Sequence, residues 1–105
     1  MAHESILVIE DEEDIAELIR YNLEREGYRV VHAESGERGL EIVRRQRPDL
    51  VLLDLMLPGI DGLEVCKRVR ADVAGAQTPI IMVTARGEEA DVGTGLELGA
   101  EDYLT

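Results

Sequence analysis

Short apolar runs alternate with amphipathic stretches along this chain. A short, predominantly aliphatic run of four to eight residues indicates a buried strand, and three such runs and one weaker candidate, YRVV, are found. They cover residues 6–9 (ILVI), 28–31 (YRVV), 50–55 (LVLLDL) and 80–83 (IIMV). The third run is apolar on both faces, as a central strand of a parallel sheet must be. A fifth strand is expected to begin in the final segment, DYLT.

Four helices are predicted between these strands from apolar residues at helical spacing. Gly27 is expected just after the first helix, because glycine adopts the left-handed conformation there readily. Ser35 is the expected N-cap of the second helix, which must end before Pro48. Asp61 is the expected N-cap of the third, and the fourth is expected from about residue 88 to residue 98. The apolar stripes are Ile15, Leu18, Ile19 and Leu23; then Leu40, Ile42 and Val43; then Leu63, Val65, Cys66 and Val69.

A strand–helix alternation of this kind predicts an α/β fold with a parallel sheet covered by helices on both faces. No linker, repeat or low-complexity segment divides residues 1–105, so we expect a single domain. The natural five-strand solution is the flavodoxin-like, doubly wound order 2-1-3-4-5. That order places a functional site at the carboxyl ends of the first and third strands.

Charge and composition narrow the function classes. The chain has 23 acidic and 11 basic residues and a formal net charge of −12. Such a field repels nucleic acid and anionic membranes, so we expect neither to bind this domain directly. The single cysteine, Cys66, excludes an internal disulfide, and no apolar run reaches the roughly 20 residues that span a bilayer. The sequence therefore predicts a cytoplasmic protein.

Carboxylates gather where the site is expected. Glu10 and Asp11 follow the first strand, and Asp54 stands near the end of the third. Converging carboxylates raise one another's pKa unless a cation lies among them, and Mg²⁺ prefers oxygen ligands of this kind. Glu13 and Asp14 need no ligand, because the dipole of the first helix favours negative charge in its first turn.

The fourth strand adds donors for an anion. It is followed by Thr84, whose hydroxyl is expected to face the same crevice, and by Ala85 and Gly87, which are small enough for backbone N–H groups to approach a ligand. A metal, a hydroxyl and backbone donors around one carboxylate predict a phosphoryl-transfer site with Asp54 as the nucleophile. Taken singly, each residue has a simpler interpretation: Asp54 could be a turn residue, and Thr84 could be a helix N-cap.

Rival chemistries fit the residues less well. An aspartyl-phosphate phosphatase would need a second acid two residues after the nucleophile, where this chain has Met56. An FMN carrier on the same fold would need phosphate donors in the first loop, which is acidic here. His3 and His32 have no clustered partner in the sequence, so a metal role for either is not expected.

The segments DLMLPGIDG, TARGEEAD and GAEDYLT, together with the acidic first loop, resemble the receiver domain of two-component response regulators, most closely the OmpR/PhoB type. The resemblance implies that Asp54 accepts a phosphoryl group from the phosphohistidine of a sensor kinase. It implies that Mg²⁺ is held by Asp11, Asp54 and the main-chain carbonyl of Met56, with Glu10 helping through water. Thr84 and Tyr103 would be the switch residues.

The same resemblance implies a phosphoprotein rather than an enzyme, with self-phosphorylation and slow self-dephosphorylation as its only chemistry. It also implies an output domain in the parent protein, expected to regulate transcription by binding DNA. Receivers carry a lysine just beyond the position of Thr105 and a fifth helix, so we interpret the chain as stopping before both. The alternative is a degenerate receiver that acts only as an interaction module.

The arrangement of helices predicts a further property. The right-handed crossover rule leaves the first helix alone on one face of the sheet. With no fifth helix beside it, that face would expose more apolar sheet than soluble monomers usually show. We therefore expect the chain to self-associate.

Overall fold

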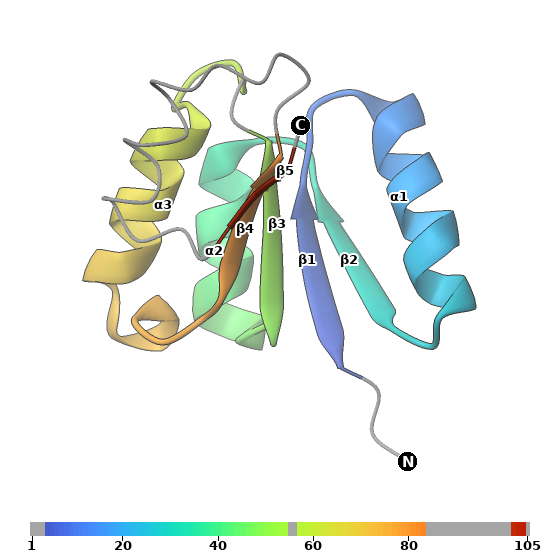
Figure 1. Ribbon diagram of the computed structural model, residues 1–105. Coiled ribbons are helices and arrows are strands. Elements are labelled where there is room, and N and C mark those ends of the chain that lie inside the picture. The colour runs from blue at the N-terminus through green and yellow to red at the C-terminus, as the bar shows by residue number, and fades with distance from the viewer. Residues whose placement is uncertain (1–3, 55–56, 84–101, 105) are drawn as a thin grey trace.

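The fold is a five-stranded sheet in which every pair of neighbouring strands is parallel, with the order β2-β1-β3-β4-β5 (Figure 1). It is seen in a computed structural model that describes residues 4–54, 57–83 and 102–104. The strands are β1 (Ser5–Ile9), β2 (Arg29–Ala33), β3 (Leu50–Asp54), β4 (Ile80–Val83) and β5 (Asp102–Leu104). The predicted α/β class, strand order and flavodoxin-like topology are confirmed.

The helices divide unequally between the two faces of this sheet. They are α1 (Glu13–Arg25), α2 (Gly36–Gln46) and α3 (Gly62–Ala71), and a short 3₁₀ turn, η1 (Val73–Gly75), follows α3. Among the helices of the described residues, Figure 1 shows α1 on one face and α2 and α3 together on the other, as the crossover rule predicts. The helix expected over residues 88 to 98 lies outside the described residues. Among the described helices, none is both long and apolar enough to cross a membrane.

The two predicted N-caps are confirmed. The hydroxyl of Ser35 accepts a hydrogen bond from the Arg38 N–H at 3.2 Å, and the Asp61 carboxylate accepts one from the Glu64 N–H at 2.9 Å. Each satisfies one of the N–H groups that the first turn of a helix leaves without a partner.

Gly27 ends α1 as predicted, but the strand that follows begins later than expected. Gly27 has φ +95°, and its N–H donates to the Glu24 carbonyl, while the Tyr28 N–H donates to the Leu23 carbonyl. These two bonds form a Schellman motif, which closes a helix. The strand predicted over residues 28–31 is therefore wrong at its start, because Tyr28 belongs to the helix cap and β2 begins at Arg29.

Alternate strand residues form two apolar clusters of unequal size. The larger lies between the sheet and α2 and α3, and it contains Leu7, Ile9, Leu40, Val43, Val51, Leu53, Val65, Cys66, Val69, Ile80 and Met82, with others. Cys66 is fully buried there, as predicted. On the α1 face the buried residues are Ile6, Val8 and Val30, with Ile19, Leu23, Leu50 and Leu52 packed against them.

The α1 face also carries an apolar groove of about 340 Å³. It is lined by Glu4, Ile6, Leu23, Tyr28, Leu50, Leu52 and Ile81. Leu50, Leu52 and Ile81 are only partly buried, although they belong to the central strands of the sheet. The sheet is thus well covered by α2 and α3 on one face and partly open beside α1 on the other.

Candidate functional site

The register of the central strands brings two acidic residues together. Ile9 pairs with Leu53 across β1 and β3, so the next residues, Glu10 and Asp54, lie side by side at the carboxyl end of the sheet. Asp54 also pairs with Val83, the last residue of β4. The site thus lies where the order of a doubly wound sheet reverses, which is where such folds bind ligands.

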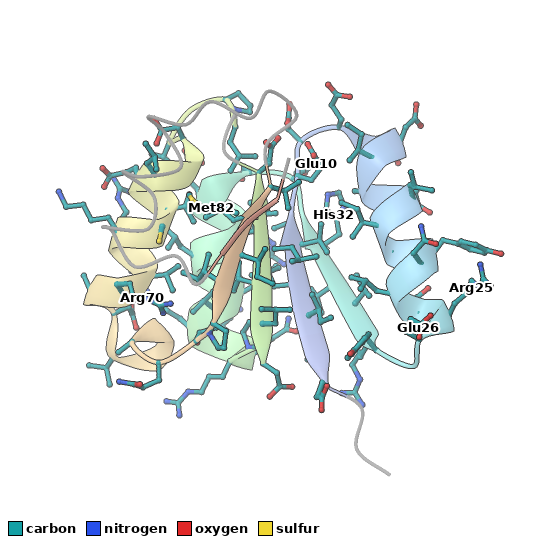
Figure 2. The ribbon with its side chains drawn as sticks, viewed as in Figure 1. Glu10, Arg25, Glu26, His32, Arg70 and Met82 are labelled. Carbon is teal, nitrogen blue, oxygen red and sulfur yellow. The ribbon has the colours of Figure 1, made fainter. Side chains whose placement is uncertain are left out.

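Three carboxylates converge at this edge. One oxygen each from Glu10, Asp11 and Asp54 can be chosen so that all lie within 4.8 Å of one another. Glu10 is buried, with 7 % of its surface exposed, whereas Asp54 is partly buried and Asp11 is exposed. Glu10 lies just after β1, at the carboxyl end of the sheet (Figure 2). The convergence that the sequence predicted is present.

The environment of Glu10 disfavours its negative charge. Burial and, to a smaller extent, the neighbouring Asp54 and Asp11 raise the pKa of its carboxyl, while a hydrogen bond from the Glu12 N–H, at 3.1 Å, opposes the rise; the net pKa is about 7. A buried acid beside other acids is stabilised by a proton or by a cation. The cluster is therefore a candidate metal centre built from hard oxygen ligands.

The other acids of the first loop are placed differently. Glu12 is the N-cap of α1, and Glu13 and Asp14 lie exposed in its first turn. Negative charge in that turn interacts favourably with the helix dipole. Glu13 and Asp14 lie outside the three-residue cluster, in agreement with the structural role expected for them.

The contact that His32 makes with the acidic loop was not predicted from the sequence. Its ring Nε2 lies 2.7 Å from the main-chain oxygen of Glu10, so the side chain reaches from β2 to the acidic loop. Figure 2 shows His32 between the sheet and α1, below Glu10. The sequence carried one usable signal: His32 stands near the end of a strand predicted to lie beside the first. The sequence pattern alone does not show that its ring extends to the Glu10 carbonyl.

Comparison with known proteins identifies the family. The family model described as "Response regulator receiver domain" matches residues 6–105. The chain belongs to this family. The resemblance inferred from DLMLPGIDG, TARGEEAD and GAEDYLT is therefore confirmed.

Two curated relatives of this receiver domain are transcriptional regulators. It is 53 % identical over 100 residues to the transcriptional regulatory protein AfsQ1 of Streptomyces coelicolor, with 95 % of this chain and 43 % of AfsQ1 covered. It is 50 % identical over 103 residues to PhoP of Bacillus subtilis, the alkaline phosphatase synthesis transcriptional regulatory protein, with 98 % of this chain and 42 % of PhoP covered. Both are OmpR/PhoB-type regulators, as the sequence suggested. The chain spans about two fifths of the length of either relative.

Solved receiver domains share its fold. The BeF₃-activated receiver domain of RstA from Klebsiella pneumoniae is 37 % identical, with a TM-score of 0.89 over 96 % of this chain and 84 % of that one. The receiver domain of the sensor histidine kinase PA1611 from Pseudomonas aeruginosa is 35 % identical, with a TM-score of 0.91 over 99 % of this chain and 85 % of that one. The PA1611 structure has a magnesium ion coordinated in its active site cleft.

The remaining residues predicted for the receiver site are only partly described. Met56, Thr84 and Ala85 lie outside the described residues. Tyr103 lies in β5, where its backbone pairs with Met82 of β4, and its side chain is outside the described part. Their roles stay predictions.

Proposed function

We propose that this single receiver domain, residues 1–105, is the phosphoacceptor switch of a two-component signalling system. Asp54 takes a phosphoryl group from the phosphohistidine of a sensor histidine kinase, in the presence of Mg²⁺. The observation that carries the proposal is the convergence of Glu10, Asp11 and Asp54 at the carboxyl ends of β1 and β3. Membership of the receiver family supports it.

The residues present fit a magnesium ion. The donor set is three carboxylates, and the raised pKa of Glu10 marks a place where positive charge is favoured. Asp11, Asp54 and the main-chain carbonyl of Met56 would hold the ion, with Glu10 acting through water. When bound, Mg²⁺ neutralises charge on the phosphoryl oxygens. The magnesium-bound PA1611 receiver domain, which has the same fold, supports this assignment.

The reaction uses the carboxylate of Asp54 as the nucleophile. One carboxylate oxygen attacks phosphorus, a new P–O bond forms, and the P–N bond to the kinase histidine breaks, leaving its electron pair on the imidazole nitrogen. The product is an acyl phosphate on Asp54. The Thr84 hydroxyl and the Ala85 N–H bind the transferred phosphoryl oxygens, and Thr84 and Tyr103 relay the change to the surface.

The proposed consequence is control of an output domain in the parent protein, which binds DNA and regulates transcription. AfsQ1 and PhoP, with the share of their length that this chain covers, support a separate output region. The net charge of −12 makes direct DNA binding by this domain unfavourable. We infer a cytoplasmic switch protein rather than an enzyme, because its phosphorylated product is the protein itself.

We also infer that the 105-residue chain self-associates through the apolar groove beside α1, with a second copy as the occupant. The groove is lined mainly by aliphatic side chains of β1, β3 and β4, which are apolar on both faces. Exposed apolar surface of this kind favours association. The opposing term is the repulsion between two chains that each carry a charge of −12.

Phosphorylation by a small acyl phosphate tests the proposed function. The intact mass should increase by one phosphoryl group when Mg²⁺ is present and should not when a chelator removes it. A chain that binds Mg²⁺ but gains no mass would indicate the degenerate alternative, an interaction module without phosphoacceptor chemistry.

A further inference from the structure

The main chain of Glu10 is held from β2 on both sides of its Cα. Its N–H donates to the Ala33 carbonyl at 3.0 Å, which completes the ladder at the last β1–β2 register pair. Its carbonyl oxygen lies 2.7 Å from Nε2 of His32. Because a carbonyl oxygen can only accept, Nε2 must carry the proton in this contact.

The contact fixes the start of the acidic loop. Two hydrogen bonds that flank one Cα restrict the φ and ψ of Glu10, and its carboxylate is held in turn by the Glu12 N–H. The peptide group whose oxygen His32 binds is the one that joins Glu10 to Asp11. The orientation of this peptide sets the direction in which the chain carries Asp11 toward Asp54.

A restraint is needed at this point because the loop is under electrostatic repulsion. Glu10 and Asp11 are adjacent in sequence, and a carboxylate oxygen of each lies within 4.8 Å of one of Asp54. When all three carboxylates are ionised, like charges at this spacing favour any movement that separates them. The ring of His32 resists that movement from β2, a strand that contributes no carboxylate to the cluster.

We propose that His32 is a positioning residue for the acidic site. It holds the Glu10–Asp11 peptide so that the three carboxylates stay converged for Mg²⁺ and for phosphorylation of Asp54. His32 touches neither the ion nor the phosphoryl group and acts only through the main chain of Glu10. The proposal rests on the function proposed above.

Substitution by leucine and by glutamine separates this role from ordinary packing. His32→Leu keeps apolar bulk against α1 and removes the donor, whereas His32→Gln keeps an N–H donor at a similar reach. Mutation of an outer-shell partner of a metal ligand typically lowers the metal affinity about 10- to 100-fold. We expect His32→Leu to weaken Mg²⁺ binding about tenfold by calorimetric titration, and His32→Gln to restore most of the loss.

Val30→Ala is the matched control. Val30 is buried on the same face of β2, at the end away from the acidic loop, so its truncation lowers stability without touching the restraint. Mg²⁺ affinity should be unchanged in Val30→Ala. An equal loss of affinity in Val30→Ala and His32→Leu, or no rescue by His32→Gln, would overturn the positioning role.

Two further measurements keep the outcomes distinct. Asp11→Asn in the same titration reports on the metal site itself: if it weakens Mg²⁺ binding and His32→Leu does not, only the role of His32 fails, and if neither weakens it, the proposed site fails. If His32→Leu does not fold, nitrogen NMR of the unmodified chain replaces it. A slowly exchanging proton on Nε2 supports the proposal, and a ring protonated only on Nδ1 contradicts it.

Discussion

A carboxylate oxygen of Glu10 lies within 4.8 Å of one of Asp54, although one residue follows β1 and the other ends β3. The pairing of Ile9 with Leu53 produces this proximity, because the next position on each strand carries an acid. Burial then makes the two residues unlike: Glu10 is 7 % exposed, whereas Asp54 is only partly buried. The pKa of Glu10 rises to about 7 as a result.

The affinity for Mg²⁺ should therefore depend on pH. Below the raised pKa of about 7, Glu10 carries a proton that opposes the ion; above it, the carboxylate is charged and favours binding. We expect affinity to rise from about pH 6 to about pH 8 and then to level off. Calorimetric titrations across this range measure it, and Glu10→Gln should flatten the dependence. An equally steep rise in Glu10→Gln would show that another group is responsible.

Asp11 should contribute to metal binding far more than its neighbour in the helix. Asp11→Asn removes one of three converging carboxylates and should lower the Mg²⁺ affinity by about tenfold or more, as is typical when a partner in a metal site is lost. Glu13→Gln changes charge by the same amount two residues away, in the first turn of α1, and should have little effect. Equal losses in the two variants would indicate diffuse electrostatic attraction instead of a site.

An added methyl group at Gly39 should strain the packing of α2 against β1. A Cβ there would overlap the Ile9 side chain, coming within 2.8 Å of Cγ1, and Ile9 is fully buried directly before Glu10. Alanine gains about 1 kcal/mol in helix propensity, and overpacking loses about 1–3 kcal/mol, so Gly39→Ala should lower the free energy of unfolding by roughly 1 kcal/mol. Urea denaturation measures it, with the exposed Gln46→Ala as the control. A more stable Gly39→Ala would mean that Ile9 moves aside freely.

Self-association of the 105-residue chain should increase with salt. Added salt screens the repulsion between copies that each carry −12 charges, and it leaves the apolar contact in place. Light scattering across a concentration series, at low and high salt, should show a mass that rises with both. Leu52→Lys in the groove should keep the chain monomeric. A compact monomer at every concentration and salt level would contradict this prediction.

Local rules allowed much of the fold to be predicted from sequence. The caps at Ser35 and Asp61 and the glycine at position 27 follow from backbone hydrogen-bonding needs that few residue types satisfy. The start of β2 was misjudged because Tyr28 is β-prone by type, yet its N–H is taken by the cap of α1.

From the sequence, the site could be predicted only where the strand order determines it. The meeting of Glu10 and Asp54 follows from strand order, since parallel strands end at one edge. The burial of Glu10 and the contact of His32 with the Glu10 carbonyl depend on register and on side-chain reach. Neither leaves a periodic signal in the sequence.

The proposed function requires Asp54 to be the phosphoacceptor, and Asp49, at the other end of β3, is a matched control. Asp54 ends this strand at the acidic cluster, whereas Asp49 precedes it at the opposite end, where its carboxylate accepts a hydrogen bond from the Ser5 N–H at 2.7 Å. The measurement is intact mass after treatment with an acyl phosphate and Mg²⁺. Asp54→Asn should abolish the added phosphoryl group and Asp49→Asn should retain it, whereas a phosphoryl group that persists in Asp54→Asn would contradict the assignment of Asp54 as the phosphoacceptor.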